Sequence, residues 1–264
     1  MNKKILISTG GSGGHVIPAT IIYKHLEDNF EVSMTSDFRG VKFLNKDEYN
    51  LKIFNVKPIS KNLLIMPFDF LLMIILIFKS VSFLRKNKIN ILISTGGYMS
   101  LPLCLSAKIL NIKLLLFEPN MVLGRSNKFF ISYCQKIFCY SNNVKKFPIK
   151  FKNKIKVIPA LLRKNFYDKR DNNNALDAIN LLIIGGSQGA KIFDDLVKNT
   201  IIKLSKKYKL KIYQQTSSIN FESFKKTYEN NNINCELFNF NDDVINFMQK
   251  TDLCITRAGA STLA

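Results

Sequence analysis

Acidic side chains are scarce in this sequence. Lysine and arginine total 39 against 19 aspartates and glutamates, which gives a formal net charge of +20. Two interpretations of this excess stay open. Lysine is abundant together with asparagine, isoleucine and phenylalanine, which have A/T-rich codons, so mutational bias alone would give a generally basic surface. Alternatively, the charge attracts anionic membrane lipid or phosphorylated substrates. No nucleic acid partner is expected, because no basic-aromatic recognition module is visible.

Paired cysteines are missing too. The five cysteines show no C-x-x-C spacing and no accompanying histidine pair, so neither a zinc site nor a disulfide framework is indicated. Three of them lie within or beside apolar runs, and we interpret them as small core residues of a protein in a reducing compartment. No signal peptide is expected, because Lys3 and Lys4 precede only three apolar residues before the first glycines.

Several nucleotide-binding and catalytic motifs are also absent. The sequence has no Gly-Lys-Ser/Thr of a Walker loop, no Asp-x-Asp metal clamp and no Gly-x-Ser-x-Gly nucleophile elbow. A dinucleotide fingerprint beginning at Gly11 fails at Val16, where a glycine belongs, although Asp37 has the place of a ribose-binding acid. What remains is diphosphate binding by backbone N–H groups and helix dipoles, with no metal and no cofactor.

Glycine-bearing loops follow four apolar strands. The first is residues 5–15, Ile-Leu-Ile-Ser-Thr-Gly-Gly-Ser-Gly-Gly-His, and Pro18 is predicted to open the next helix. Its first seven residues recur at 91–97, and related units occupy 181–190 and 253–262. Glycine lets backbone N–H groups approach a ligand closely, and a helix N-terminus beyond such a turn suits phosphate. We expect these loops to line one cleft, to which two similar halves of the chain contribute.

Apolar strands alternate with helical patterns along the chain, which predicts parallel sheets covered on both faces. In such sheets ligands bind at the carboxyl ends of the strands, where all four glycine loops fall. The predicted strands lie near 4–8, 31–35, 53–56, 91–94, 113–117, 136–140, 155–158, 180–184, 209–214, 234–238 and 252–256. The predicted helices lie near 18–28, 39–46, 64–86, 101–110, 124–134, 189–206, 220–229 and 243–249.

A polar, Asn-rich stretch at 164–178 interrupts this alternation and indicates a linker. The predicted fold is therefore α/β, with two doubly wound, Rossmann-like domains facing a cleft. We place an N-terminal domain at 1–160, the linker at 161–179 and a C-terminal domain at 180–264. The last strand and loop should open a further helix and none follows, so we expect the second domain to be incomplete and the sequence to be truncated.

Residues 63–84 form the most apolar stretch, with an uninterrupted apolar run at 70–78. That run is too short for a spanning helix, which needs about 20 largely apolar residues. A core helix and an interfacial membrane patch both stay open as interpretations. The apolar residues occupy every face of the run, more than one packing stripe requires, and the basic cluster at 79–88 suits anionic headgroups. The second interpretation predicts contact with an anionic membrane surface through 63–88.

The chain resembles the MurG family in five segments that fall in this order: Thr9-Gly-Gly-Ser-Gly-Gly-His15, Gly96-Gly-Tyr98, Glu118-Pro-Asn120, Gly185-Gly-Ser-Gln-Gly-Ala190 and Arg257-Ala-Gly-Ala-Ser-Thr262. This family adds N-acetylglucosamine to undecaprenyl-diphosphate-MurNAc-pentapeptide in peptidoglycan synthesis. The resemblance implies a GT-B fold, no essential metal, and a peripheral place on the cytoplasmic face of the bacterial membrane. It also implies two partners: the lipid-linked acceptor, whose diphosphate the loops at 5–15 and 94–100 face, and UDP-GlcNAc, held by the 185–190 and C-terminal loops.

His15 and Glu118 are the candidate catalytic residues. His15 is interpreted as a base for the acceptor hydroxyl or a partner of the diphosphate, and otherwise as a capping residue. Glu118 is interpreted as an alternative base, a residue that orients His15, or a solvated loop acid. The implied reaction is an inverting displacement in which the 4-hydroxyl of MurNAc attacks the anomeric carbon and UDP leaves. The candidate substrate-binding residues are Ser12, Gly13, Gly14, Tyr98, Asn120, Arg163, Ser187, Gln188, Asn241, Ala260, Ser261, Thr262, Leu263 and Ala264.

Some positions depart from the family pattern. Pro119 replaces the usual glutamine, residues 159–163 read Pro-Ala-Leu-Leu-Arg in place of Gly-Asn-Pro-Val-Arg, and Asn241 stands where the family has an apolar residue. The glutamate and glutamines that the family places after Ala264 lie beyond the sequence. We therefore carry an alternative, a non-catalytic, membrane-associated nucleotide-binding module or an inactive remnant. A nicotinamide-dependent oxidoreductase is a third, which Val16 disfavours.

Overall fold

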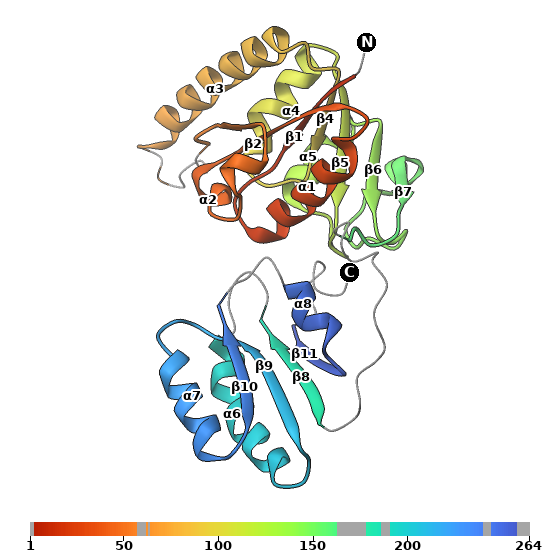
Figure 1. Cartoon of the computed structure of the whole chain (residues 1–264). Helices are drawn as coiled ribbons and strands as arrows, with labels where there is room; N and C mark the ends of the chain where they lie inside the picture. The colour runs from red at the N-terminus through yellow and green to blue at the C-terminus, as the bar shows by residue number, and fades with distance from the viewer. Residues whose placement is uncertain are drawn as a thin grey trace. The chain divides into compact units, whose positions relative to one another are not determined.

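The computed structural model describes residues 3–56, 62, 64–162, 178–185, 191–239 and 244–257. The chain divides into two compact units, residues 1–164 and residues 165–263. Each unit contains one parallel sheet with helices packed against it, as Figure 1 shows. The two doubly wound α/β folds expected from the sequence are confirmed.

The N-terminal unit has a seven-stranded parallel sheet in the order β3-β2-β1-β4-β5-β6-β7. Its strands are β1 (Lys4–Ser8), β2 (Glu31–Ser36), β3 (Leu51–Ile53), β4 (Ile91–Ser94), β5 (Lys113–Glu118), β6 (Lys136–Cys139) and β7 (Ile155–Val157). Its helices are α1 (Gly13–Leu26), α2 (Phe38–Val41), α3 (Met66–Lys86), α4 (Ser100–Ile109) and α5 (Arg125–Phe130), with short 3-10 turns η1 (Lys46–Glu48) and η2 (Ile149–Lys154).

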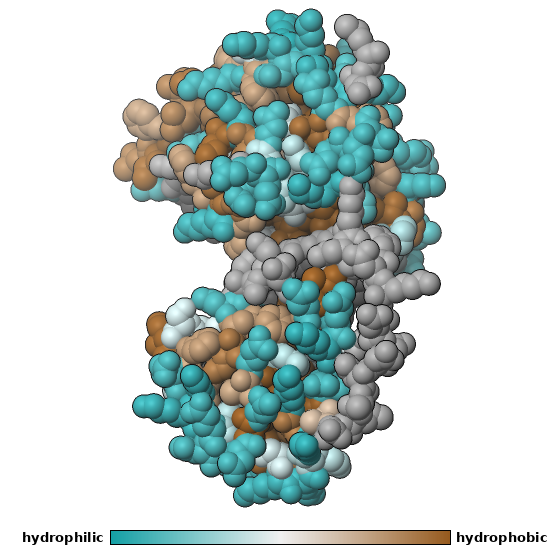
Figure 2. Space-filling model, viewed as in Figure 1, coloured by the Kyte–Doolittle hydropathy of each residue, from teal (hydrophilic) through white to brown (hydrophobic). Residues whose placement is uncertain are grey.

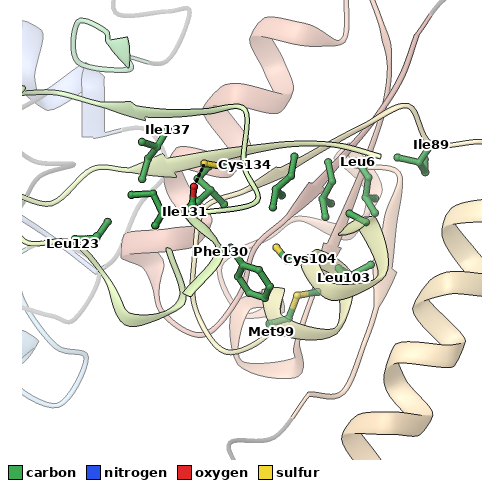
Figure 3. Packing of buried hydrophobic residues seen from close by; sticks show 14 of the residues in the cluster. Leu6, Ile89, Met99, Leu103, Cys104, Leu123, Phe130, Ile131, Cys134 and Ile137 are labelled. Atoms are coloured by element: carbon green, nitrogen blue, oxygen red, sulfur yellow. Dashed lines mark hydrogen bonds between the residues drawn. The ribbon is translucent and has the colours of Figure 1, made fainter. Parts of the chain in front are cut away.

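Alternation along the strands builds a core on each face of this sheet. In β1, Leu6 joins the cluster that α3, α4 and α5 cover, whereas Ile5 and Ile7 join the opposite cluster under α1. Figure 3 shows the first cluster, in which Leu103 of α4 and Phe130 of α5 lie among the strand side chains. A strand buried on both faces needs apolar residues at successive positions, which is why the sequence shows continuous runs there.

The C-terminal unit has a four-stranded parallel sheet in the order β10-β9-β8-β11. Its strands are β8 (Ile179–Ile184), β9 (Leu210–Gln215), β10 (Asn234–Phe238) and β11 (Leu253–Thr256). Its helices are α6 (Lys191–Ser205), α7 (Phe221–Asn230) and α8 (Val244–Gln249). Ile183, Ile201 and Ile212 are fully buried between the sheet and α6, so this unit has a core of its own.

One predicted helix start is wrong. We expected Pro18 to open the first helix, but α1 begins at Gly13 and Pro18 lies inside it. The Ser12 carbonyl accepts hydrogen bonds from the N–H groups of His15 (3.0 Å) and Val16 (3.2 Å), which closes the first turn. Proline at such an interior position removes one N–H donor and crowds the carbonyl four residues earlier, yet α1 continues through Pro18 to Leu26. The glycines are thus the first helical residues, with their N–H groups at the helix end.

Helix α3 covers the core with one stripe only. Met73, Leu76 and Phe83 pack against the core, whereas Phe68 and Phe78 keep 69% and 71% of their surface exposed. Of the two interpretations of this segment, the buried core helix is therefore wrong for all but that stripe. By length and composition alone, α3 is the one helix in the described part of the chain that is able to cross a membrane.

The cysteine interpretation is confirmed for three residues. Cys104, Cys134 and Cys139 are buried and free, and all three belong to the core cluster of which Figure 3 labels Cys104 and Cys134. Burial raises the pKa of the Cys104 and Cys139 thiols to about 12, so neither forms a thiolate at neutral pH. These cysteines therefore act as core side chains.

Candidate functional site

The loop after β1 is held in shape by Asp37, which follows β2. One Asp37 carboxylate oxygen accepts hydrogen bonds from the N–H groups of Gly11 (2.8 Å) and Gly40 (2.9 Å). A Cβ atom at Gly10 would lie 2.7 Å from that same oxygen, so only glycine fits there. The other Asp37 oxygen accepts from Arg39 at 2.8 and 3.0 Å. Asp37 therefore builds the glycine-rich loop and has no oxygen left for a ribose, which removes the basis of the nicotinamide alternative.

The charge of Asp37 is stabilised by these partners. Burial by itself raises the pKa of the Asp37 carboxyl, but the Gly11 and Gly40 amides and the Arg39 guanidinium outweigh burial and hold its pKa below the usual value. A depressed folded-state pKa contributes stability above the unfolded-state pKa, and this contribution is lost as the pH falls through the folded-state value. The loop is therefore expected to loosen in acid.

We expect Asp37→Asn to lower the free energy of unfolding of the N-terminal unit by about 1–3 kcal/mol at pH 7, because an amide NH₂ then faces an existing donor. The difference from the wild type should shrink as the pH falls below the usual carboxyl range. Denaturant titrations at pH 7, 4 and 2 measure it, with the exposed Asp47→Asn as control. Equal stability of the Asp37 variant and the wild type at pH 7 would contradict this role.

The start of α1 is open to an anion. Ser12 is the N-cap residue, yet its hydroxyl makes no capping hydrogen bond, and the first turn carries no acidic residue. Gly14 is exposed and Ser12 and His15 are half-buried, so this end of the helix reaches the surface. Free N–H groups and the positive end of the helix dipole favour a phosphate or diphosphate here. The predicted binding residues Ser12, Gly13 and Gly14 lie together in this turn.

The loop after β4 lies beside it and holds the ring of His15. The Thr95 hydroxyl donates to the Thr9 hydroxyl at 2.9 Å, joining the two glycine loops. The His15 Nδ1 lies 2.7 Å from the Thr95 carbonyl oxygen. Cβ atoms at Gly96 and Gly97, both with positive φ, would lie 3.4 and 3.7 Å from the His15 ring. These are ordinary van der Waals distances, so the positive φ at both positions, and not the space beside the imidazole, favours glycine here.

This contact assigns the tautomer of His15. A carbonyl oxygen only accepts, so Nδ1 carries the proton and Nε2 has its lone pair available. No side chain or backbone group among the described residues hydrogen-bonds to Nε2. An imidazole fixed through Nδ1, whose neutral form presents the Nε2 lone pair beside an anion-binding turn, is suited to take a proton from a hydroxyl.

Glu118 is placed differently from what the sequence indicated. Only 2% of its surface is exposed, so the interpretation as a solvated loop acid is wrong. Its two oxygens accept four hydrogen bonds from three residues: the Asn120 N–H (3.2 Å) and Nδ2 (3.0 Å), the Gly124 N–H (2.7 Å) and the Asn127 Nδ2 (3.0 Å). A carboxylate with both oxygens engaged in this way holds the loop after β5. The geometry gives no support to Glu118 as an alternative base.

Asn127, in α5, was missed by the sequence reasoning. Its Nδ2 donates to the Phe117 carbonyl and to Glu118, both at 3.0 Å, which fixes the orientation of the amide. Its Oδ1 is buried and has no partner among the described residues. A Cβ atom at Gly96 would lie 3.5 Å from the Asn127 Nδ2, so this amide packs beside the loop that holds His15. The one feature of the sequence that could have indicated this role is a polar residue in the first turn after Gly124.

Two further predicted residues, Tyr98 and Asn120, lie at this same edge of the sheet. Both are exposed, each in the loop that follows a strand, β4 and β5 respectively. The Asn120 Nδ2 donates to Glu118 at 3.0 Å, which fixes the orientation of this amide. Their roles as substrate-binding residues stay predictions.

The predicted donor-side residues lie outside the described residues: Arg163, Ser187, Gln188, Asn241, Ala260, Ser261, Thr262, Leu263 and Ala264. The described framework next to them is well bonded. The Gly185 N–H donates to Gln215 at 3.0 Å, and Asp194 accepts from Thr216 and Asn220, both at 2.9 Å. These bonds tie the end of β8 and the start of α6 to the loop after β9. Roles of the donor-side residues themselves stay predictions.

Comparison with protein families matches both units. Residues 5–139 match the glycosyltransferase family 28 N-terminal domain, and residues 180–264 match the glycosyltransferase family 28 C-terminal domain. In the part of the chain that the structure describes, no group of three or more His, Cys, Asp and Glu side chains gathers to hold a metal.

Similar proteins carry one name. A UDP-N-acetylglucosamine–N-acetylmuramyl-(pentapeptide) pyrophosphoryl-undecaprenol N-acetylglucosamine transferase of Pelagibacter ubique is 89% identical over 264 residues, which are 100% of this chain and 74% of that protein. The transferase of the same name from Rickettsia bellii is 34% identical, over 99% of this chain and 75% of that protein. The chain thus spans about three quarters of the length of these relatives.

Solved structures of similar fold agree with these sequence matches. The crystal structure of Acinetobacter baumannii MurG matches with a TM-score of 0.72 and 25% identity, covering 99% of this chain and 73% of that one. A UDP-GlcNAc 2-epimerase from Neisseria meningitidis, bound to UDP-GlcNAc, matches with a TM-score of 0.60 and 14% identity over 97% of this chain and 78% of that one, a likeness of fold alone.

Proposed function

The chain belongs to glycosyltransferase family 28, among its N-acetylmuramyl-(pentapeptide) pyrophosphoryl-undecaprenol N-acetylglucosamine transferases, and on that premise we propose how its residues act. It is a MurG-type hexosyltransferase of the GT-B fold, which moves N-acetylglucosamine from UDP-GlcNAc to the 4-hydroxyl of MurNAc in undecaprenyl-diphosphate-MurNAc-pentapeptide. The carrying observation is the identity of 89% with a transferase of that name along the whole chain. The alternative of a non-catalytic binding module is not favoured by it.

The N-terminal site supplies the proton acceptor for this reaction. The acceptor oxygen forms a bond to the anomeric carbon of the sugar, the bond from that carbon to the diphosphate oxygen of UDP breaks, and the hydroxyl proton passes to His15 Nε2. The proton on Nδ1 stays bonded to the Thr95 carbonyl at 2.7 Å, which orients the ring and stabilises the imidazolium that forms. Configuration at the anomeric carbon is inverted by this single displacement.

The first turn of α1 holds the acceptor diphosphate. The Ser12 hydroxyl and the N–H groups of Gly13 and Gly14 lie at a helix end without acidic residues. An anion bound there interacts with the helix dipole and with N–H groups that have no intrahelical partners. His15 lies in the same turn, so the diphosphate and the base are set at a fixed separation by the backbone. Ser187 and Gln188 are assigned to UDP-GlcNAc by the family pattern.

A transfer assay tests this function. The protein is incubated with radiolabelled UDP-GlcNAc and the undecaprenyl-linked acceptor, and label in the lipid fraction is counted. We expect label to enter the lipid fraction and UDP to be released in equal amounts. UDP binding seen by calorimetry without transfer would support the binding-module alternative. If the protein neither bound UDP nor transferred the sugar, the proposal would be overturned.

We also propose that α3 attaches the protein to the membrane surface. Phe70, Ile74 and Phe78 are exposed on this helix, and the basic residues of the 79–88 segment follow. Figure 2 shows apolar side chains gathered over α3, a larger apolar area than scattered surface residues produce. Exposed apolar residues beside lysines and arginines suit the interface of an anionic bilayer. The membrane surface that we propose for this attachment is the cytoplasmic face of the cell membrane, where the substrates of the reaction meet.

Replacing Ile74 and Phe78 together by aspartate is expected to release the protein from vesicles that contain anionic lipid. The two side chains are 43% and 71% exposed, so the variant should keep its fold. Vesicle sedimentation measures the bound fraction, and circular dichroism checks the fold. Substitution of two exposed lysines away from α3, Lys206 and Lys209, is the control for charge alone. A folded double variant that sediments like the wild type would refute attachment through α3.

A further inference from the structure

A groove of about 560 Å³ runs between β3 and the inner side of α3. Its floor includes the rings of Phe54 and Phe83, which pack edge to face with their centroids 5.5 Å apart. Leu72 and Leu76 of α3 form one wall, and Ile53 of β3 belongs to the other. This volume lies in the range of small-molecule sites, and water in an apolar groove is readily displaced by hydrocarbon.

The groove starts at the edge of the sheet that carries the site. Ile53 pairs with Ser36, the last residue of β2, and the next residue, Asp37, binds the glycine-rich loop. In the strand order β3-β2-β1, the end of β3 is two strands from the start of that loop, which is about 10 Å at the usual spacing. A ligand whose diphosphate lies at the first turn of α1 therefore has the mouth of the groove within reach.

Charge at the groove matches such a ligand. Lys52 and Lys79 line it and are exposed, and Asp69 is the one acid among the described lining residues. The groove is also continuous with α3, whose other side carries the exposed apolar residues (Figure 2). This apolar groove has lysines among its lining residues and begins near the first turn of α1, where the diphosphate is proposed to bind. It therefore fits a molecule that joins a hydrocarbon chain to a diphosphate.

We propose that this groove binds the first isoprene units of the polyprenyl chain of the lipid-linked acceptor, next to its diphosphate. The proposal rests on the proposed function for the identity of the acceptor. The groove thereby distinguishes a polyprenyl diphosphate from a diphosphate without a chain, and it draws the start of the chain out of the bilayer along α3. Leu72, Leu76 and Phe83 are the side chains that contact the hydrocarbon.

Binding is tested by fluorescence, because the sequence contains no tryptophan. Leu72→Trp places an indole on the groove wall, and Leu71→Trp places one at the adjacent position, which is equally exposed but does not line the groove. With geranylgeranyl diphosphate we expect the emission of the first variant to shift to shorter wavelength and that of the second to stay unchanged. Inorganic diphosphate should shift neither. A shift in both variants, or in neither, would overturn the proposal.

Kinetics provide a second test. Leu72→Glu places a carboxylate on the groove wall, and we expect the KM for a long-chain acceptor to rise about tenfold, a typical effect of losing a hydrophobic contact. The KM for an acceptor with a one-carbon group in place of the chain, and the KM for UDP-GlcNAc, should not change. Equal changes for both acceptors would overturn the proposal. Absence of any transfer by the wild type would overturn the proposed function instead, while the fluorescence test of the groove remains decisive.

Discussion

His15→Ala is expected to lower kcat by about 10²–10⁴-fold, the usual contribution of a general base. In the neutral ring the Nε2 atom has its lone pair free, because Nδ1 donates to the Thr95 carbonyl at 2.7 Å. Alanine removes the proton acceptor while it leaves the helix and the first turn of α1 intact. UDP binding should stay within twofold of the wild type, since the family pattern places UDP at the C-terminal loops. Initial rates at saturating substrates, with calorimetry for UDP, measure both quantities.

The control for this experiment is His25→Ala, which removes the other histidine of the chain. His25 lies near the far end of α1 and its Nε2 contacts the Leu162 carbonyl at 2.9 Å. We expect kcat of that variant to stay close to that of the wild type. If His15→Ala raises the KM for the acceptor and leaves kcat unchanged, His15 binds the diphosphate and does not take the proton. If neither parameter changes, His15 is only a packing residue.

Glu118→Gln is expected to lower the free energy of unfolding of the N-terminal unit by about 2–4 kcal/mol. Each carboxylate oxygen accepts two hydrogen bonds, so a side-chain NH₂ on either side would face two donors in a site that is 2% exposed. Gly124 adds to the constraint, because a Cβ there would already lie 3.0 Å from Glu118. Thermal and denaturant unfolding measure the loss, with the exposed Glu222→Gln, in the other unit, as control.

This substitution also separates a positioning residue from a base. If Glu118 holds the loop, the variant loses stability, and its activity returns in part under stabilising conditions such as lower temperature or added osmolyte. If Glu118 took the proton, stability would be unchanged and kcat would fall at every temperature. An exposed glutamate exchanged for glutamine usually changes stability by less than about 0.5 kcal/mol, so the control variant sets the background.

Much of the fold follows directly from local sequence. Continuous apolar runs such as Ile5–Ile7 belong to strands buried on both faces, and the repeated strand-glycine units belong to the carboxyl ends of parallel strands. Proline is a poor guide to the start of α1, because backbone hydrogen bonds to the Ser12 carbonyl begin the helix five residues before Pro18. The sequence does not show which face of α3 is buried, because its apolar run covers every face of the helix. Only packing in the folded chain shows which stripe is covered.

The candidate site divides in the same way. Sequence by itself determined the loops, the presence of His15 after a glycine turn and the acid at the end of β5, because each depends on residues close together in the chain. Tertiary structure decided what these residues do. The Thr95 carbonyl that fixes the His15 tautomer is 80 residues away, and the Asp37 carboxylate that shapes the Gly11 turn is 26 residues away. Hydrogen bonds between separate strands depend on sheet order and register, which no local pattern of residues specifies.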